Sequence, residues 1–398
     1  MANRRAVIID IVRSPFIRGR PDGQLVGLHP VDLYAQVLQG LMARTSVSAA
    51  LIEDVITGCV IQVGEQSGNI GRQAVLAAGL PASVPAVTLD RKCGSAQQAV
   101  DFAAQGVIAG AYDVVIAGGV EMMSTVPMKA NRMGRDNLGQ MLLKAYPEGY
   151  VNQGVSAELI ASKWKIDRQA MDAFALASHV NAASAQDKKL TTSPIIPIAV
   201  PTAEGVCVIR MDDGIRRDTT LEKLGALKPA FRTEELARRF PEIGWNVTAG
   251  NSSQITDGAF AALVMEESVA QRLGFSPKAA ITHFSVSGDD PTLMLTAIIP
   301  ATRKLLQRAG VALQDISAFE VNEAFASVVL AWLKEFPVDP HLVNQFGGAI
   351  ALGHPVGASG GRLLINLLTA LDRSGGRYGI QTMCESGGMA NATFVERL

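Results

Sequence analysis

A glycine-rich run surrounds one histidine near the carboxyl end of the chain: Gly347-Gly348-Ala349-Ile350-Ala351-Leu352-Gly353-His354-Pro355-Val356-Gly357-Ala358-Ser359-Gly360-Gly361. Small residues on both sides let the backbone approach His354 closely and leave room for a ligand, while Pro355 stiffens the turn that presents the imidazole. Histidine is also the side chain best suited to exchange a proton near neutral pH. The run therefore indicates a loop built around a proton-transferring group.

The chain contains the same unit twice, and His354 belongs to the second copy. In the first copy a predicted strand follows Asp54 and a later strand leads into Cys93. In the second copy a predicted strand follows Asp315, and Leu342-Val343-Asn344 leads toward His354. Cys93 follows Asp54, and His354 follows Asp315, by the same 39 residues. We expect the two copies to place Cys93 and His354 at equivalent strand-to-helix junctions that face each other.

The elements after the two loops repeat as well. Apolar residues at helical spacing occupy 97–108 and 362–371, with few charges between them. Each helix gives way to a strand with a glycine pair: residues 114–119 end in Gly118-Gly119, and residues 380–384 precede Gly387-Gly388. Alternating strands and helices predict an α/β protein with mostly parallel sheets and helices on their faces.

A segment of different composition, rich in proline, glycine and charge, separates the halves from Met122 to about Asn251. It contains one clear amphipathic helix, 167–186, whose start Asp167 can cap. Its methionines could line an adaptable acyl pocket or fill gaps in an irregular loop. These methionines are Met122, Met123, Met128, Met133 and Met141. We interpret the insertion as a cap over the site.

Composition excludes several classes of function. The 398 residues are 48% apolar and 18% charged. Because the net charge is −1, electrostatics does not favour binding to nucleic acid. No apolar run reaches the length of a membrane span. Asp10 interrupts the first apolar stretch, which makes a poor signal peptide and predicts a cytoplasmic protein. Cys59 and Cys207 receive no role, and no metal site is expected, because the cysteines lack metal-ligand spacing. A phosphate-binding loop and a nicotinamide fingerprint are also missing from the sequence.

Cys93 has the features of a nucleophile. A free thiol is only about 3% ionised at pH 7, so a nucleophilic cysteine needs assistance. The amino end of the following helix and either Arg91 or Lys92 would favour the thiolate. We expect a direct hydrogen bond from His354 to be the dominant activator. A cysteine merely packed at the start of a buried helix is the structural alternative.

Cys384 and Asn322 complete the candidate set. Cys384 ends an apolar strand, and the turn Glu385-Ser386-Gly387-Gly388 would leave its thiol at the edge of the sheet rather than inside it. There it could exchange protons with a substrate carbon or another thiol, although simple burial is the alternative. The Asn322 amide could donate to a thioester oxygen. Two thiols and a base suggest acyl-thioester chemistry.

Together these segments resemble the thiolase family, the acyl-CoA C-acetyltransferases. The resemblance covers essentially the whole chain, and its motifs are specific when they occur in this order. It rests on Arg13-Ser14-Pro15-Phe16, Cys93-Gly94-Ser95, 167–183, Thr248-Ala249-Gly250-Asn251, 322–325, the His354 loop and the Cys384 turn.

The resemblance implies a thiolase fold, a five-layered αβαβα core made of two similar halves with an inserted loop domain. The N-terminal half would comprise 1–121 and 251–273 and carry the nucleophile. The loop domain, 122–250, would bind coenzyme A and cap the site. The C-terminal half, 274–398, would carry the other catalytic groups. A homodimer or homotetramer is also implied.

The resemblance further implies a ping-pong reaction. Cys93 would attack the keto carbon of a 3-ketoacyl-CoA, acetyl-CoA would leave, and a second coenzyme A would collect the acyl group. His354 would activate Cys93 and, with Asn322 through a water, form one oxyanion site. Cys384 would protonate the departing enolate, or deprotonate acetyl-CoA in the reverse Claisen condensation. The backbone N–H groups of Cys93 and Ser386 would form the second oxyanion site.

Coenzyme A would act as a substrate, with no permanently bound cofactor. Arg216 would lie near its adenine end, and Ala249 and Ser253 along its pantetheine. Two departures from the family pattern are Ser386, which replaces the first of three glycines, and Ala96, where glycine is common. The pair Asn152-Gln153 resembles thiolases acting on bulky substrates, including sterol side chains.

We therefore expect a degradative thiolase for a medium or bulky acyl group, with a biosynthetic acetoacetyl-CoA thiolase as the alternative. Ketoacyl synthases and hydroxymethylglutaryl-CoA synthases share the fold and one cysteine, but Cys384 argues against them. A catalytically inactive relative that binds acyl-CoA or lipid is less compatible with the intact set of four groups.

Overall fold

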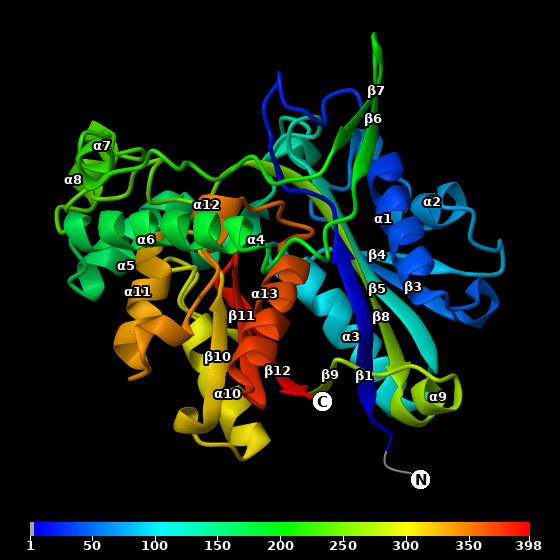
Figure 1. Ribbon diagram of the computed structural model, residues 1–398. Helices are drawn as coiled ribbons and strands as arrows, with labels where there is room; N and C mark the ends of the chain where they lie inside the picture. Colours follow the sequence, from blue (N-terminus) through cyan, green and yellow to red (C-terminus); the bar gives the residue numbers. More distant parts are fainter. Residues whose placement is uncertain (1–3, 148) are drawn as a thin grey trace.

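The computed structural model describes residues 4–147 and 149–398 (Figure 1). Residues 1–3 of the expected N-terminal half and residue 148 of the expected loop domain lie outside this range. The strands are β1 (Ala6–Arg13), β2 (Ile17–Arg18), β3 (Asp54–Gly58), β4 (Ala86–Leu89), β5 (Val114–Met122), β6 (Ile198–Thr202), β7 (Gly205–Ile209), β8 (Thr256–Glu266), β9 (Ala279–Gly288), β10 (Ile316–Val321), β11 (Tyr378–Glu385) and β12 (Met389–Arg397). The helices are α1 (Pro30–Thr45), α2 (Ile70–Ala77), α3 (Ser95–Ala109), α4 (Gly139–Ala145), α5 (Gln153–Lys163), α6 (Arg168–Asp187), α7 (Leu221–Gly225), α8 (Glu234–Arg239), α9 (Glu267–Arg272), α10 (Ile298–Ala309), α11 (Ala326–Glu335), α12 (Ala349–Leu352) and α13 (Ser359–Ser374).

One hydrogen-bonded path of strands runs through the molecule in the order β10-β11-β12-β9-β1-β8-β5-β3-β4. Its two ends have the same design. In the first half β3 pairs in parallel with β4 and β5, and β8 and β1 follow in antiparallel pairing. In the second half β10 pairs in parallel with β11, and β12 and β9 follow in antiparallel pairing. An antiparallel pairing of β1 with β9 joins the halves.

The expectation of mostly parallel sheets is therefore wrong. The strand–helix–strand units are parallel as predicted, but each half closes with antiparallel strands. The reason is clear in the second half, where the tight turn at Gly387 and Gly388 connects β11 directly to β12. A connection that short can only join antiparallel neighbours.

Five layers result from this arrangement. Helices α3 and α13 pack against each other, and each contacts strands of both halves, so they form a central layer between the two parts of the sheet (Figure 1). Helices α1 and α2 cover the outer face of the first half, and α10 covers that of the second, beside α11. Strands β5 and β8 are buried along their whole length because helices cover both faces. The predicted αβαβα architecture is confirmed.

The two central helices are those predicted from apolar spacing, extended by a few residues at each end. Each ends at a glycine in the left-handed conformation, Gly110 with φ of 81° and Gly375 with φ of 68°, which only glycine adopts without a steric penalty. The predicted strand at 342–344 is reduced to one parallel bridge between Phe319 and Val343. That bridge occupies the place beside β10 that β4 occupies beside β3.

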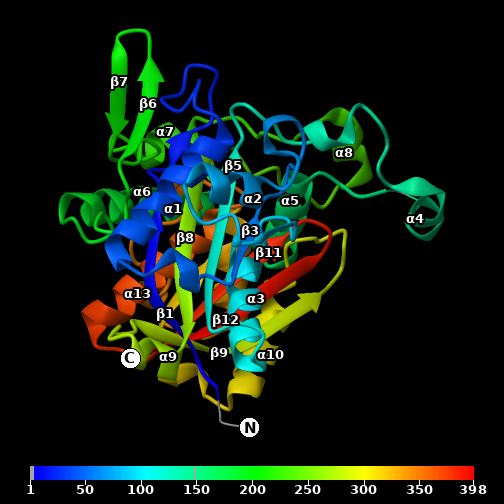
Figure 2. The same cartoon turned by 90° about the vertical axis from the view of Figure 1, so that its right-hand side faces the viewer.

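The insertion between β5 and β8 contains more structure than predicted. Helix α6 forms as expected, and Asp167 caps it by accepting a hydrogen bond from the backbone N–H of Ala170 at 2.8 Å. Helices α4, α5, α7 and α8 and the β6–β7 hairpin were not predicted. The β6–β7 hairpin and helix α4 project from the rest of the molecule on different sides (Figure 2). No helix of the described residues is both long and apolar enough to cross a membrane.

Candidate active site

The Cys93 loop lies between β4 and α3 at the centre of the molecule. Gly94 is the N-cap position of α3, and the Cys93 side chain is 8% exposed. The Ser95 hydroxyl holds the loop, because it donates to the carbonyl of Lys92 at 2.6 Å and accepts from the backbone N–H of Arg91 at 2.8 Å. This loop presents the thiol just before the amino end of a helix.

Cys93 belongs to a cluster of buried apolar side chains. The other members are Val60, Ile61, Met123, Val126, Val356, Leu363 and Met383. Buried Glu121 holds part of this wall in place by accepting backbone hydrogen bonds from Val60 at 2.8 Å and Ile61 at 3.1 Å. Of the methionines in the insertion, Met122 and Met123 are buried, whereas Met133 and Met141 are 78% and 89% exposed. Met123 is thus the methionine of the insertion that shares a buried cluster with the nucleophile.

Cys384 lies inside the sheet rather than at its edge, so that expectation is wrong. Strand β11 continues through Glu385, Cys384 is paired with Ala390 of β12, and its side chain is 1% exposed. The loop of Cys93 packs against the same end of β11, because Glu385, the residue after Cys384, lies against Gly94, the residue after Cys93. The turn begins only at Ser386, so the strand is longer than the sequence indicated.

The hydrogen bonds of His354 define its tautomer. Ser359 Oγ lies 2.6 Å from His354 Nδ1 and donates its own proton to the carbonyl of Pro355 at 2.9 Å. A hydroxyl has one proton, so Ser359 accepts from Nδ1–H, and the lone pair of His354 is on Nε2. The backbone N–H of His354 is held by Gln254 O and Thr256 Oγ1 at 3.1 and 3.0 Å. The imidazole is therefore fixed with its basic nitrogen toward the candidate site.

Asn322 links His354 to Cys384. Its Nδ2 lies 3.5 Å from His354 Nε2, and a hydrogen bond from its side chain favours the Cys384 thiolate. The backbone N–H of Asn322 donates to Thr382 at 3.1 Å, which fixes the end of β10 against β11. The Asn322 Oδ1 atom is buried without a hydrogen-bond partner among the described residues. One imidazole, one amide and one thiol thus form a continuous polar line.

Burial controls the acidity of these groups. It raises the pKa of Cys93 to about 12, with a further increase from the Glu385 carboxylate and smaller decreases from a backbone hydrogen bond and Lys92. Burial, followed by the charge of Cys93, raises the pKa of Cys384. Burial and nearby Arg362 lower the pKa of His354 to about 3, so the imidazole is neutral at pH 7. Both thiols are protonated at pH 7, and the neutral imidazole is able to accept a proton.

The expected direct hydrogen bond between Cys93 and His354 is not among the hydrogen bonds of the described residues. Asn322 and Ser359 occupy the two imidazole nitrogens instead. Ser386, the other candidate for an oxyanion site, is half-buried, and its Oγ contacts Met294 Sδ at 3.8 Å. Its backbone follows Glu385 directly, two positions after Cys384.

A cavity of about 170 Å³ adjoins the His354 loop. Two of the three residues expected to bind coenzyme A, Arg216 and Ala249, line it, whereas Ser253 does not. Further lining residues that the sequence did not reveal are His179, Asp218, Thr219, Lys223, Leu224, Leu227, Gly250, Gln254 and Ile350. Gln254 ties the cavity to the catalytic loop, because its amide donates to the carbonyls of Ile350 and Ala351 in α12.

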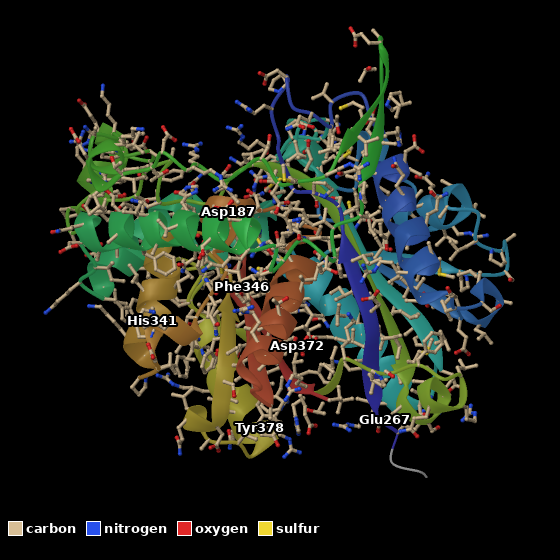
Figure 3. All side chains as sticks on the ribbon, viewed as in Figure 1. Asp187, Glu267, His341, Phe346, Asp372 and Tyr378 are labelled. Atoms are coloured by element: carbon tan, nitrogen blue, oxygen red, sulfur yellow. The ribbon has the colours of Figure 1, made fainter. Side chains whose placement is uncertain are left out.

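A second cavity of about 370 Å³ continues from the first along α6. The two share His179, Arg216 and Thr219, so they form one groove. Arg217 borders the outer part and pairs with Asp187. Asp187 lies at the carboxyl end of α6 (Figure 3). Lys188 also borders this part, which gives the outer groove several cationic side chains.

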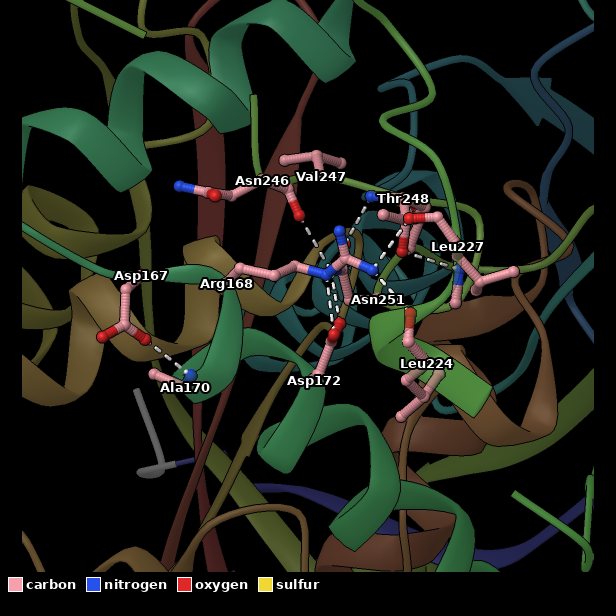
Figure 4. A network of polar contacts seen from close by, with 12 residues as sticks. Asp167, Arg168, Ala170, Asp172, Leu224, Leu227, Asn246, Val247, Thr248 and Asn251 are labelled. Carbon is pink, nitrogen blue, oxygen red and sulfur yellow. Dashed lines mark hydrogen bonds and ion pairs between the residues drawn. The ribbon is translucent and has the colours of Figure 1, made fainter. Parts of the chain in front are cut away.

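A buried polar network fixes the inner wall of the groove (Figure 4). Arg168 pairs with Asp172 at 2.6 Å and donates to the carbonyls of Leu224 and Leu227 at 2.5 and 3.0 Å. Asp172 accepts in turn from Asn251 Nδ2 at 2.9 Å. The network holds α6, α7 and the Thr248-Ala249-Gly250-Asn251 segment in a fixed relation, which preserves the shape of the cavity.

Comparisons with known proteins agree with this architecture. The thiolase N-terminal domain matches residues 6–268 and the thiolase C-terminal domain matches residues 275–397. The steroid 3-ketoacyl-CoA thiolase FadA6 of Mycobacterium tuberculosis is 44% identical, covering 99% of this chain and 94% of the relative. The beta-ketoadipyl-CoA thiolase of Escherichia coli is 39% identical, covering 99% and 100%.

A solved structure gives the same result for the fold. The acetyl-CoA acetyltransferase of Bacillus anthracis superimposes with a TM-score of 0.89 at 36% sequence identity, covering 100% of both chains. Both family domains and these full-length similarities lead to one conclusion: the chain belongs to the thiolase family of acyltransferases.

Proposed function

We propose that the protein cleaves a 3-ketoacyl-CoA with coenzyme A to give acetyl-CoA and a shortened acyl-CoA, and catalyses the reverse condensation. The observation that carries this proposal is the meeting of four groups from distant parts of the chain. The residues that follow Cys93 and Cys384, Gly94 and Glu385, pack against each other, and Asn322 lies between His354 and the strand of Cys384. Two thiols, a neutral base and an amide at one place match the requirements of this reaction.

In the cleavage direction, Cys93 is the nucleophile, and His354 and Cys384 transfer protons. The Cys93 thiol gives its proton to His354 Nε2, and the thiolate attacks the keto carbon of the substrate. The carbon–carbon bond breaks, and its electron pair forms the enolate of acetyl-CoA, which takes a proton from Cys384. Coenzyme A then gives its thiol proton to the Cys384 thiolate and attacks the acyl group. Cys93 leaves as a thiolate and recovers its proton from His354.

Oxyanions form at both carbonyl groups during this sequence. Asn322 Nδ2, with His354 through a water, would stabilise one, and the backbone N–H groups of Cys93 and Ser386 the other. The orientation of Asn322 beside His354 Nε2 supports the first assignment. For the second, the direct succession of Cys384, Glu385 and Ser386 at the end of β11 supports the position of the donor.

Coenzyme A would occupy the groove beside α6. Arg216 and the cations of the outer part would contact its phosphates, while Ala249 and the apolar side chains of Leu224 and Leu227 would border the pantetheine. Ser253 would act from the position next to Gln254, which lines the cavity. The groove ends at α12, so a thioester on this pantetheine would reach the His354 loop.

A degradative role with a medium or bulky acyl group fits the apolar surroundings of Cys93 and the names of the steroid and beta-ketoadipyl relatives. We also propose the three-part division of 1–121 with 251–273, 122–250 and 274–398, a cytoplasmic location and a homodimer or homotetramer. Terminal strand β4, with Val87 45% exposed, offers an unpaired edge for such an assembly.

A panel of 3-ketoacyl-CoA substrates tests the proposal. Release of acetyl-CoA that depends on added coenzyme A is expected, with the highest kcat/KM for acyl groups longer or bulkier than acetoacetyl. Maximal kcat/KM for acetoacetyl-CoA would instead favour the biosynthetic alternative. Binding of acyl-CoA without any turnover would contradict the enzymatic role.

A further inference from the structure

A buried carboxyl, that of Glu385, follows one thiol in the chain and packs against the loop of the other, and it has no role in the reaction described above. Glu385 ends β11, next to Cys384, and is 0% exposed. Neither of its carboxyl oxygens has a hydrogen-bond partner among the described residues. A buried carboxyl that only stabilised the fold would have its oxygens hydrogen-bonded, because an unpaired polar group costs stability. We therefore infer that the Glu385 carboxyl has a role other than stabilising the fold.

The position of Glu385 is defined by the loop of the nucleophile. A Cβ atom added to Gly94 would lie 2.0 Å from Glu385 Oε1, so the carboxyl fills the space that a side chain would take at residue 94. Asn391 of β12 donates to the carbonyl of Gly94 at 3.1 Å and closes the same pocket. Glycine is needed at this position because the carboxyl packs against the backbone that follows Cys93.

The charged groups facing this carboxyl come from two neighbouring segments. Arg91 and Asp90 precede Cys93, and Asp101 lies in α3. The positive charge of Arg91 lowers the pKa of Glu385, whereas the negative charges of Asp101 and Asp90 raise it. Lys92 pairs with Asp90 at 2.6 Å. On balance burial dominates and raises the pKa of Glu385 to about 8. The carboxyl is therefore mostly neutral at pH 7.

We propose that Glu385 is a positioning residue for the two thiols: as a neutral acid it permits thiolate formation at Cys93, and as a carboxylate it holds both thiols protonated. This inference rests on the proposed function, in which Cys93 and Cys384 must each pass through a thiolate. The charge of Glu385 raises the pKa of both cysteines, so its ionisation opposes both steps. The neutral form is the active form.

The proposal has a distinctive consequence for the pH dependence of Cys93. Below the pKa of Glu385 the thiolate fraction rises about tenfold per pH unit, as for any thiol below its own pKa. Above it, Glu385 takes up the proton that Cys93 releases, so the pair holds one proton in either arrangement. The thiolate fraction then stops rising. His354 cannot produce this plateau, because its lowered pKa keeps it neutral throughout.

Alkylation of the full-length protein by iodoacetamide measures this thiolate without coenzyme A or acyl-CoA. Peptide mapping by mass spectrometry follows modification of Cys93 alone, from pH 6.5 to 9.5. Between pH 8 and 9 the wild-type rate is expected to rise less than about twofold, whereas that of Glu385→Gln rises about tenfold. Because no substrate is used, failure of this test and failure of the proposed thiolase reaction are distinguishable.

Two control variants assign the effect. Asp101→Asn removes a buried carboxyl that faces Glu385 and should keep the plateau, as should Glu266→Gln, which removes a buried carboxyl that caps α9. If Glu385→Gln does not fold, Glu385→Ala, which also frees the space beside Gly94, serves in its place. A wild-type rate that rises tenfold per unit through pH 9, or a plateau that survives loss of Glu385, would overturn the proposal.

Discussion

Removal of the Ser359 hydroxyl tests the assignment of His354 as a base that acts through Nε2. Ser359 is fully buried and accepts from His354 Nδ1 at 2.6 Å. In Ser359→Ala the Nδ1–H would lose its acceptor in a site where His354 is only 5% exposed. An unpaired buried donor costs about 1–3 kcal/mol, which corresponds to roughly a 5- to 150-fold loss if the cost falls on the transition state.

Rapid-quench measurement of the acylation rate of Cys93 is the assay, together with the melting temperature of the variant. Ser374→Ala is the matched control, because its hydroxyl donates to the carbonyl of Ala370 at 2.9 Å near the other end of α13. Ser359→Ala should slow acylation within the range above, while Ser374→Ala should not. An unchanged acylation rate in a folded Ser359→Ala protein would refute the tautomer and the role of Ser359 in holding it.

Three further predictions concern other parts of the site. Cys384→Ala should still accept an acyl group from acetyl-CoA on Cys93 but lose about 10²- to 10⁴-fold in condensation and cleavage, measured by single-turnover kinetics; an equal loss of acyl transfer would argue against a separate role for Cys384. Gly94→Ala should destabilise the protein by about 1–3 kcal/mol in denaturant unfolding, and much less in a Glu385→Ala background, since the clash is with that carboxyl. Arg216→Ala should raise KM for coenzyme A by about tenfold or more with little change in kcat, as expected for a lost phosphate contact; an unchanged KM would exclude the groove.

The sequence predicted those parts of the fold that carry a periodic pattern. Helices α3 and α13 have apolar residues at helical spacing and a terminal glycine, and both form. Helix α5 was missed because small residues bury it on several sides, among them Gly154, Ser156 and Ala157, so no polar face marks it. The antiparallel strands were missed because the prediction rested on strands that alternate with helices. Strand β12 follows β11 through a tight turn, and β8 pairs with β5 after a long insertion, so neither belongs to that pattern.

The same distinction holds for the candidate site. Cys93, His354 and Cys384 could be selected because glycine follows each thiol and surrounds the imidazole. The groove residues His179 and Lys223 could not, since each is an isolated polar residue whose neighbours come from other elements. The tautomer of His354 could not be predicted either, because it depends on the acceptor to which the Ser359 hydroxyl donates. Such facts depend on tertiary contacts rather than on local sequence.

The central claim is that the Cys93 thiolate forms the covalent intermediate. Its most direct test is to mix the protein with a 3-ketoacyl-CoA in the absence of coenzyme A, quench, digest and locate the acyl group by mass spectrometry. An acyl group on the Cys93 peptide, which disappears when coenzyme A is added, is the predicted result. Turnover with no adduct on Cys93, or with the acyl group on another residue, would contradict the account.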